Sequence, residues 1–300
     1  MGFLNKLERF ASKSWPERRS TLRFYSRQAF SKMPFLPVRL RLDVAPGECL
    51  RFWWSYLPSV DQPGRSLLQY WDGEDGELRF LWKFLQPEMT FFDVGAFHGI
   101  FSLVASSKLA SQGRIVAFEP SPRERRRFKL HMRMNGVGNV RLEPYAISTE
   151  IGAAKFFTVT SGLTCMNSLQ PPAVDHPIRE ISVQAIPFDH YLNQRKGPSP
   201  DLMKIDVEGA ELAAFAGASN LLTSIRPLII CEVLDKVTQP WGYNAREIIH
   251  RLRNRDYCWF DFGVDGRIAP HVSRETYPDL RNYLAVPTEK IRQVDRWVRG

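Results

Sequence analysis

Apolar residues follow two alternating spacings through most of the chain. Short apolar runs predict buried strands over residues 89–94, 114–118, 139–146, 201–206, 227–233, 257–262 and 282–286. Between these runs, apolar side chains recur at helical spacing and predict helices over residues 99–111, 121–135, 209–223 and 244–255. We therefore expect an α/β fold, with a mostly parallel seven-stranded sheet and helices on both of its faces.

The alternation lapses between residues 147 and 200. Residues 155–159 and 181–186 predict short antiparallel strands, and residues 189–194 predict a short helix. We interpret residues 89–300 as one domain that carries this segment as an insertion. Since binding residues often lie on such connections, we expect the insertion to help form the acceptor side of a site.

The first 42 residues hold most of the positive charge of the chain. The net charge of the whole chain is +9, and residues 1–42 hold ten Lys and Arg residues against two Glu residues. Apolar residues within the first eleven fall on one helical face: Phe3, Leu4, Leu7, Phe10 and Ala11. This partly helical basic leader suits an anionic membrane surface or nucleic acid. A solvated basic face, or a helix docked on its own domain, also explains the pattern and is the simpler interpretation.

Residues 43–88 predict an N-terminal elaboration that packs on the core. Pro and Gly residues separate its short apolar runs and indicate hairpins and loops, and residues 77–85 predict a helix. No apolar run approaches the roughly 18 residues of a membrane span, and no continuous signal segment opens the chain. The four cysteines are scattered without a C-x-x-C pair, which favours a reducing compartment over a zinc cluster. We therefore expect a cytoplasmic protein, with membrane contact through the leader as an alternative.

The first chemical signal is the segment from Phe91 to Glu119. A strand ends in Asp93-Val-Gly95, a helix follows Gly99, and Glu119 ends the next strand 24 residues after Gly95. This order is typical of a nucleoside site in which the second acid accepts hydrogen bonds from ribose hydroxyls. Phe97 occupies the position of the second glycine of a dinucleotide fingerprint. Its ring would crowd a pyrophosphate, so the pattern favours S-adenosylmethionine over a nicotinamide cofactor.

The second chemical signal runs from Leu202 to Glu211. A predicted strand ends at Asp206, and strand alternation places Lys204 on the same face. A lone acid at the end of an apolar strand is costly unless it meets water or a ligand, so we interpret Asp206 as functional. Glu208 and Glu211 lie three residues apart at a helix start, where acids also favour the helix dipole. Since Asp93, Glu119 and Asp206 each end a strand, we expect them to face one crevice.

The order of these motifs resembles the FkbM family of class I S-adenosylmethionine-dependent methyltransferases, over residues 90–235. The matching pieces are Phe92-Asp93-Val94-Gly95-Ala96-x-x-Gly99, Val116-x-Phe118-Glu119-Pro120-x-Pro122, Asn135 with Asn139-Val140, Lys204-Ile205-Asp206-Val207-Glu208-Gly209-x-Glu211, and Pro227 with Glu232. The resemblance implies a Rossmann-like fold and O-methylation, often of sugar hydroxyls in glycolipids, polysaccharides or glycosylated metabolites. His98 departs from the asparagine usual in the family. It either contacts the methionine part of the cofactor or is a structural histidine that caps the helix.

The resemblance also implies roles for particular residues. The cofactor-binding set comprises Asp93, Gly95, Ala96, His98, Gly99, Glu119 and Pro120. Of these, Glu119 would hold the ribose. Asp206 would lie beside the transferred methyl group, within a catalytic set that also includes Lys204, Glu208 and His98. Because a hydroxyl acceptor must lose its proton, we take Asp206 as the first candidate for the base and His98 as the second.

Three alternatives remain open from the sequence. Asp206, Glu208 and Glu232 together suit a divalent cation such as Mg²⁺ or Ca²⁺, provided that the fold brings them together. The basic leader suits a nucleic-acid methyltransferase or an RNA-binding protein, although the Asn/Asp-Pro-Pro-Tyr/Phe signature common in amino-group methylases is missing. A non-enzymatic scaffold would retain the same fold. The sequence indicates no particular oligomeric state and no particular acceptor.

Overall fold

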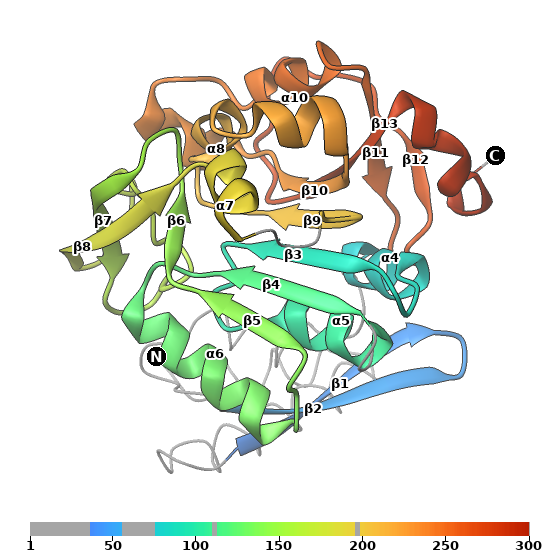
Figure 1. The fold of residues 1–300 in the computed structure, drawn as a ribbon, viewed down its shortest axis with the longest axis horizontal. Helices are drawn as coiled ribbons and strands as arrows, with labels where there is room; N and C mark the ends of the chain where they lie inside the picture. The colour runs from blue at the N-terminus through green and yellow to red at the C-terminus, as the bar shows by residue number, and fades with distance from the viewer. Residues whose placement is uncertain (1–36, 56–75, 110–112, 196–198, 300) are drawn as a thin grey trace, which may run out of the picture.

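An eight-stranded sheet forms the centre of the computed structural model (Figure 1), which describes residues 37–55, 76–109, 113–195 and 199–299. Its order is β12-β11-β13-β10-β9-β3-β4-β5. The strands are β3 (Thr90–Val94), β4 (Arg114–Phe118), β5 (Val140–Glu143), β9 (Leu202–Ile205), β10 (Leu228–Glu232), β11 (Tyr257–Phe262), β12 (Ile268–Pro270) and β13 (Asn282–Pro287). The five strands from β10 to β5 are parallel, and β13 lies antiparallel between β10 and β11. The predicted mostly parallel sheet is confirmed, and β12 adds a strand to the seven expected.

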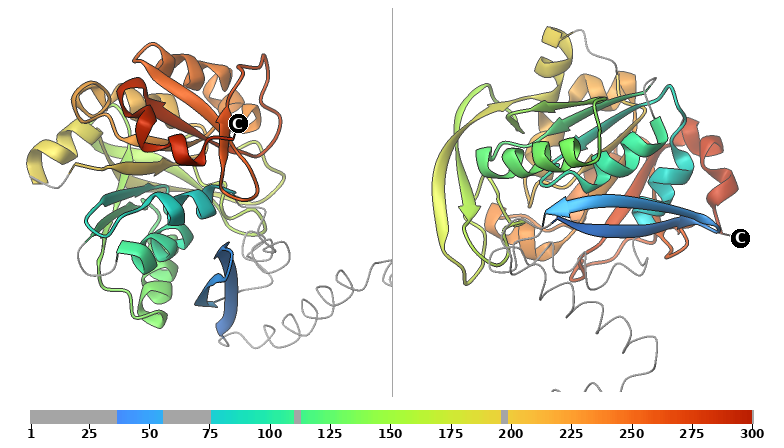
Figure 2. Two further views of the ribbon diagram at one scale, coloured as in Figure 1. Left: turned by 90° about the vertical axis from the view of Figure 1, so that its right-hand side faces the viewer. Right: turned by 90° about the horizontal axis from the view of Figure 1, so that it is seen from below.

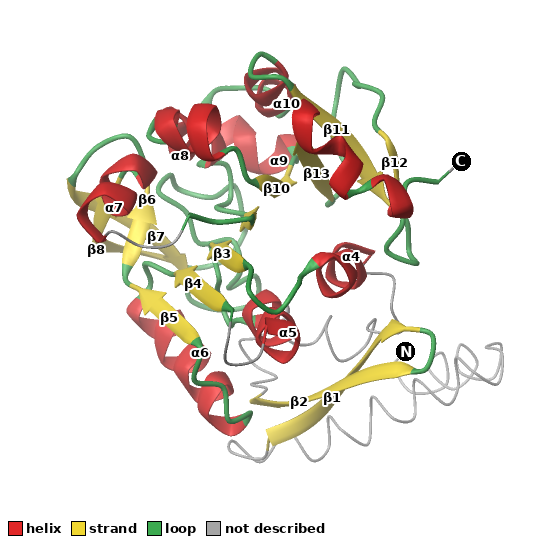
Figure 3. Cartoon of the chain, turned by 45° about the vertical axis from the view of Figure 1, so that its right-hand side comes forward, coloured by secondary structure: helices red, strands yellow, loops and turns green. Residues whose placement is uncertain are grey.

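Helices cover both faces of this sheet (Figure 3). One face carries α4 (Gly76–Phe84), α5 (Ile100–Leu109) and α6 (Pro122–Met134), and the other carries α7 (Phe188–Arg195), α8 (Glu211–Ala216) and α10 (Arg246–Arg253). Neighbouring strand residues supply opposite cores: Phe91 packs with the first set and Phe92 with the second. Successive side chains of a strand point to opposite faces of the sheet, and both faces are buried. This explains why the strands are continuous apolar runs.

A β-hairpin of β1 (Pro37–Ala45) and β2 (Glu48–Ser55) packs beside α4, α5 and α6 (Figure 2). Buried and exposed residues alternate along β1, and the buried ones are Val38, Leu40, Leu42 and Val44. Because β1 begins at Pro37, the hairpin crosses the boundary at residue 42 that the sequence suggested for the basic leader. The rest of that leader, including the helical face predicted within its first eleven residues, lies outside the described ranges.

Side chains at the C-terminal end of α6 and at its C-cap hold the end of β2 in place. The Asn135 side chain accepts the backbone N–H of Trp53 at 2.7 Å and donates to its carbonyl at 2.8 Å. His131 accepts the backbone N–H of Ser55 through Nε2 at 3.2 Å, so its proton lies on Nδ1, which is 2.8 Å from the carbonyl of His98. Burial lowers the pKa of His131 to about 3, which keeps the ring neutral. The hairpin is thereby tied to the turn that follows β3.

The insertion forms a second sheet of three strands, in the order β6-β8-β7. These are β6 (Tyr145–Ile147), β7 (Gly152–Val159) and β8 (Ile178–Ile186), and β7 pairs antiparallel with β8 as predicted. The single strand expected over residues 139–146 was wrong, since the chain leaves the central sheet at Pro144 and enters the smaller one. Proline has no N–H for a strand ladder, which accounts for the break there.

The helix expected over residues 209–223 is also interrupted. It ends at Ala216, and a separate π-helical turn covers Leu221–Ile225. A Cβ atom on Gly217 would overlap the carbonyl oxygen of Ser148, so the chain packs closely against the insertion here. The remaining short helices are α9 (Asp235–Thr238) and three 3₁₀ turns, at Gln239–Trp241, Thr288–Gln293 and Asp295–Trp297. Within the described ranges, the chain forms no helix with the length and hydrophobicity needed to cross a membrane.

Candidate active site

A cavity of about 490 Å³ opens at the carboxyl ends of β3, β4 and β9. As the strand order implied, Asp93, Glu119 and Asp206 line this one cavity. The other predicted site residues that line it are Gly95, Ala96, His98, Gly99, Pro120, Lys204 and Glu208. The motifs that the sequence singled out on three strands therefore converge on one pocket.

The turn after β3 depends on close contact with the turn after β9. Gly95 has a φ of +77°, and a Cβ atom there would overlap the carbonyl oxygen of Asp206. The backbone N–H groups of Gly95 and Ala96 both donate to the carbonyl of Phe118, at 3.1 and 3.0 Å. Gly99, with a φ of +86°, sits against the aromatic ring of Phe128 in α6. Glycine is required at these two positions because a side chain would meet both strain and neighbouring atoms.

Glu119 is a buried carboxylate held by backbone amides. One of its oxygens accepts the N–H of Phe97 at 2.9 Å and the other accepts the N–H of Ser121 at 2.8 Å. Burial, reinforced by the nearby charge of Glu124, raises the pKa of Glu119 to about 8. Each carboxylate oxygen can accept a second hydrogen bond, so Glu119 retains acceptor capacity toward the cavity.

Asp93 is buried in β3 and uses only one of its oxygens. Its Oδ2 atom accepts the N–H and the hydroxyl of Ser102, at 3.1 and 2.6 Å. Its Oδ1 atom has no hydrogen-bond partner among the residues that the structure describes. Burial raises the pKa of Asp93 despite the opposing charge of Lys204. A buried acceptor of this kind is costly unless a donor reaches it.

His98 lies in an internal network although it also lines the cavity. Its Nε2 atom is 2.7 Å from the buried carboxylate of Glu124, and its ring stacks on that of Phe97 with centroids 3.6 Å apart. Burial favours the neutral form of Glu124, but His98 and Arg123 outweigh it and lower the pKa of Glu124 below its ordinary value. This arrangement supports a structural role for His98, because its Nε2 atom interacts with the Glu124 side chain.

Lys204 and Asp206 form an ion pair at the end of β9. The Lys204 Nζ atom is 2.8 Å from Asp206 Oδ2 and also lies over the ring of Phe101. Burial would lower the pKa of Lys204, but the charges of Asp206 and Asp93 raise it above its ordinary value. Lys204 is therefore a cation inside the site, and Asp206 keeps a second carboxylate oxygen.

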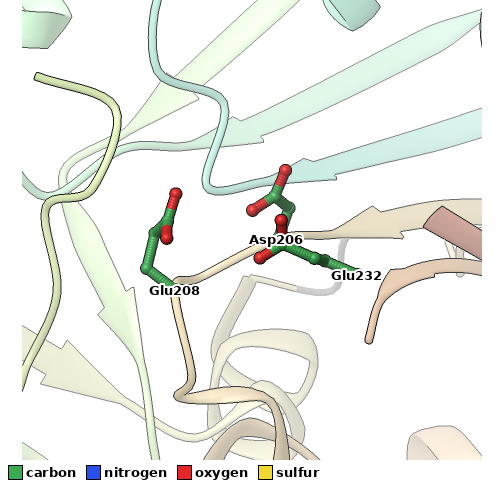
Figure 4. Close-up of side chains that lie close together, drawn as sticks. All are labelled: Asp206, Glu208 and Glu232. Atoms are coloured by element: carbon green, nitrogen blue, oxygen red, sulfur yellow. The ribbon is translucent and has the colours of Figure 1, made fainter. Parts of the chain in front are cut away.

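Three acidic side chains come together beside this ion pair (Figure 4). Asp206, Glu208 and Glu232 each offer an oxygen, and these oxygens lie within 4.8 Å of one another. Burial and the neighbouring charge of Asp206 raise the pKa of both Glu208 and Glu232 well above the ordinary value. Glu208 has a φ of +54° and precedes α8, so it belongs to the turn and not to the helix. The helix-dipole explanation thus applies to Glu211, whose carboxylate accepts the N–H of Val207 at 3.0 Å.

Several cavity residues were not identified as site residues from the sequence. Trp54 comes from the hairpin, Cys165 and Asn167 from the insertion, and Leu280 from the loop before β13. From the sequence alone, a tryptophan such as Trp54 is explained equally by core packing or by stacking on a sugar ring, and the other three lie outside any regular pattern. Only the positions of the hairpin, the insertion and the loop before β13 against the sheet bring these residues to the site.

A family model described as "Methyltransferase FkbM domain" matches residues 93–258. The hexuronic acid methyltransferase AglP of Haloferax volcanii is 24% identical over 158 residues, which cover 53% of this chain and 62% of that protein. This chain therefore spans less than two thirds of the relative's length.

Matches among solved structures include two proteins of different origin. The methyltransferase FkbM of Methylobacillus flagellatus KT matches at 15% identity and a TM-score of 0.43, over 67% of this chain and 44% of that chain. Fibrillarin of Aeropyrum pernix, solved with natively bound S-adenosyl-L-methionine, matches at 13% identity and a TM-score of 0.40, over 67% of each chain.

Proposed function

Since the chain belongs to the FkbM methyltransferase family, we propose that it is an S-adenosylmethionine-dependent O-methyltransferase. We further propose that its acceptor is a hydroxyl group of a sugar, in a glycolipid, a polysaccharide or a glycosylated metabolite. The observation that carries the proposal is the convergence of Asp93, Glu119 and Asp206 on one cavity, in the positions that the family motifs assign to cofactor and acceptor.

The residues of the cavity fit this cofactor. Glu119 has acceptor capacity for two ribose hydroxyls, and the unpartnered Asp93 Oδ1 atom suits the ammonium of an amino-acid tail. Gly95 and Gly99 allow the turn after β3 to pack closely against Asp206 and Phe128. When bound, S-adenosylmethionine supplies a methyl group on a sulfonium. The neutral thioether that this sulfonium becomes is a good leaving group. The contribution of the protein is therefore alignment of the acceptor and removal of its proton.

Asp206 is the best-placed base for that proton. Its side chain is 25% exposed and lines the cavity, and Lys204 engages only one of its oxygens. The other oxygen can accept the proton of an acceptor hydroxyl as the oxygen of that hydroxyl takes the methyl group. His98 is the weaker candidate, since its Nε2 atom serves Glu124.

The similarity to AglP supports a sugar as the acceptor. AglP is a hexuronic acid methyltransferase by its name, and its similarity to this chain covers 53% of the chain. The hairpin and the insertion, which contribute Trp54 and Cys165 to the cavity, are the parts that would shape the acceptor pocket.

Transfer of a radiolabelled methyl group tests the function directly. The full chain is incubated with labelled S-adenosylmethionine and with separate glycolipid, polysaccharide, small-metabolite and nucleic-acid fractions of a cell extract. We expect base-stable label in a glycan-containing fraction. Label in nucleic acid alone would support the nucleic-acid methyltransferase instead, and failure of the protein to bind S-adenosylhomocysteine in calorimetry would refute both.

We expect cofactor affinity to rise with pH and then level off near pH 8. Ribose hydroxyls that donate to Glu119 favour its ionised form, whereas burial holds the pKa of the free protein at about 8. Below that pH, binding must release a proton, so the affinity should rise about tenfold per pH unit. Titration calorimetry with S-adenosylhomocysteine between pH 6 and 9, in buffers of different ionisation enthalpy, measures both the affinity and the released proton.

Glu119→Gln provides the matched control for this pH dependence. The amide presents an NH₂ group to one of the two backbone N–H donors, so we expect affinity to fall about 10- to 100-fold, in line with an unsatisfied buried donor. The pH dependence and the proton release should both vanish. An unchanged pH profile in this variant would show that another group titrates.

A further inference from the structure

We propose that Asp206, Glu208 and Glu232 bind one divalent cation that prefers oxygen ligands, Mg²⁺ or Mn²⁺. The three side chains come from two neighbouring strands: Asp206 follows β9, Glu208 lies in the turn after it, and Glu232 ends β10. Figure 4 shows Glu232 extending toward Asp206, with Glu208 facing them from the opposite side. Binding of the cation stands by itself, whereas its part in methyl transfer rests on the proposed function.

The spacing of the three oxygens suits a single cation. Oxygens on opposite sides of a bound Mg²⁺ or Ca²⁺ lie about 4 to 5 Å apart, given bond lengths of roughly 2.0 to 2.6 Å. The three oxygens of Asp206, Glu208 and Glu232 lie within 4.8 Å of one another. Movement of these side chains toward one another would bring all three oxygens into the first coordination shell of one ion.

Glu232 supplies an independent observation that points to a ligand. Its side chain is 4% exposed, and its Oε2 atom has no hydrogen-bond partner within the described part of the chain. The nearby ammonium of Lys204 is already 2.8 Å from Asp206. A cation bound beside it would satisfy this buried oxygen.

The charge balance favours a divalent ion over a monovalent one. Three ionised carboxylates with the Lys204 ammonium leave two negative charges, and one divalent cation neutralises both. Asp206 and Glu208 line the cavity, whereas the buried Glu232 is not among the lining residues. A cation held between them would keep one side open to an acceptor hydroxyl and would lower the pKa of that hydroxyl.

Binding of Mn²⁺ to the full chain tests the proposal without any acceptor. We expect electron paramagnetic resonance to detect one bound Mn²⁺ per chain, displaced by Mg²⁺. Glu232→Gln should weaken Mn²⁺ binding at least tenfold. Glu208→Gln is the second variant, in case the first fails to fold, and circular dichroism and thermal unfolding verify both. Equal Mn²⁺ affinity in the wild type and in a folded variant would overturn the proposal.

The matched control separates this site from the cofactor site. Glu119→Gln lies in the same cavity but outside the acidic group, so it should bind Mn²⁺ like the wild type while losing S-adenosylhomocysteine affinity. Glu232→Gln should bind Mn²⁺ weakly but, in a titration in EDTA, should bind S-adenosylhomocysteine like the wild type. Mn²⁺ binding without any cofactor binding would keep the cation site and reject the proposed function. Cofactor binding without Mn²⁺ binding would keep the function and reject the cation site.

Discussion

Replacement of Asp206 by asparagine is expected to lower kcat by about 10² to 10⁴, the usual contribution of a general base. The side chain keeps its shape, so the contact between the turns after β3 and β9 should persist. It loses the negative charge that faces the cavity and pairs with Lys204 at 2.8 Å. Steady-state methyl transfer measures kcat, and calorimetry with S-adenosylhomocysteine should show cofactor affinity within a few-fold of the wild type.

Glu211→Gln is the matched control for Asp206→Asn. Glu211 lies five residues further along the same segment but does not line the cavity, and an amide oxygen can still accept the N–H of Val207. We expect its activity to stay close to that of the wild type. Retention of most activity in Asp206→Asn would exclude Asp206 as the base. If that variant also loses Mn²⁺, restoration of its rate at high Mn²⁺ would assign the loss to the cation and not to proton transfer.

Replacement of Gly95 by alanine should destabilise the protein and abolish cofactor binding. Gly95 has a φ of +77°, which costs a side-chain-bearing residue about 1 to 2 kcal/mol. Its Cβ atom would also overlap the carbonyl oxygen of Asp206, and such overpacking adds about 1 to 3 kcal/mol. The two turns must then separate, which displaces both the cofactor loop and the proposed base. Denaturant unfolding and titration with S-adenosylhomocysteine measure the two effects.

Gly47→Ala isolates the backbone contribution. Gly47 has a nearly identical φ of +78° in the turn of the β1–β2 hairpin, but a Cβ atom there meets nothing within 4 Å. We expect it to lose only about 1 to 2 kcal/mol and to bind the cofactor normally. Equal destabilisation by the two substitutions would show that contact between the two turns is unimportant.

The central sheet was predictable because its strands are buried on both faces. Residues such as Phe91 and Phe92 pack into opposite cores, so the whole run must be apolar whatever its neighbours are. The strand β1 escaped prediction because its alternating Val38, Leu40 and Leu42 lie beside arginines in a segment whose charge dominated the interpretation. The break at Pro144 and the helix end at Gly217 depend on the insertion, whose position the local pattern does not encode.

Within the site, the sequence predicted that the acids at the ends of parallel strands lie close together. Strand order alone brings Asp93, Glu119 and Asp206 to one edge. The environment of each one was not predictable, since it depends on contacts between distant segments. His98 and Glu124, which interact through their side chains, are 26 residues apart in the sequence. Trp54 and His131, whose rings stack, are 77 residues apart.

The sequence by itself determined the α/β class, the family resemblance and the cofactor motifs, because hydrophobic period and glycine-acid spacing are local properties. The tertiary structure alone decided that the hairpin and the insertion wall the cavity and that Glu232 joins Asp206 and Glu208. It also decided which acids are buried deeply enough for their pKa values to rise, as for Glu119 and Glu232. Burial and charge proximity arise from packing between segments far apart in the chain, and no local pattern specifies them.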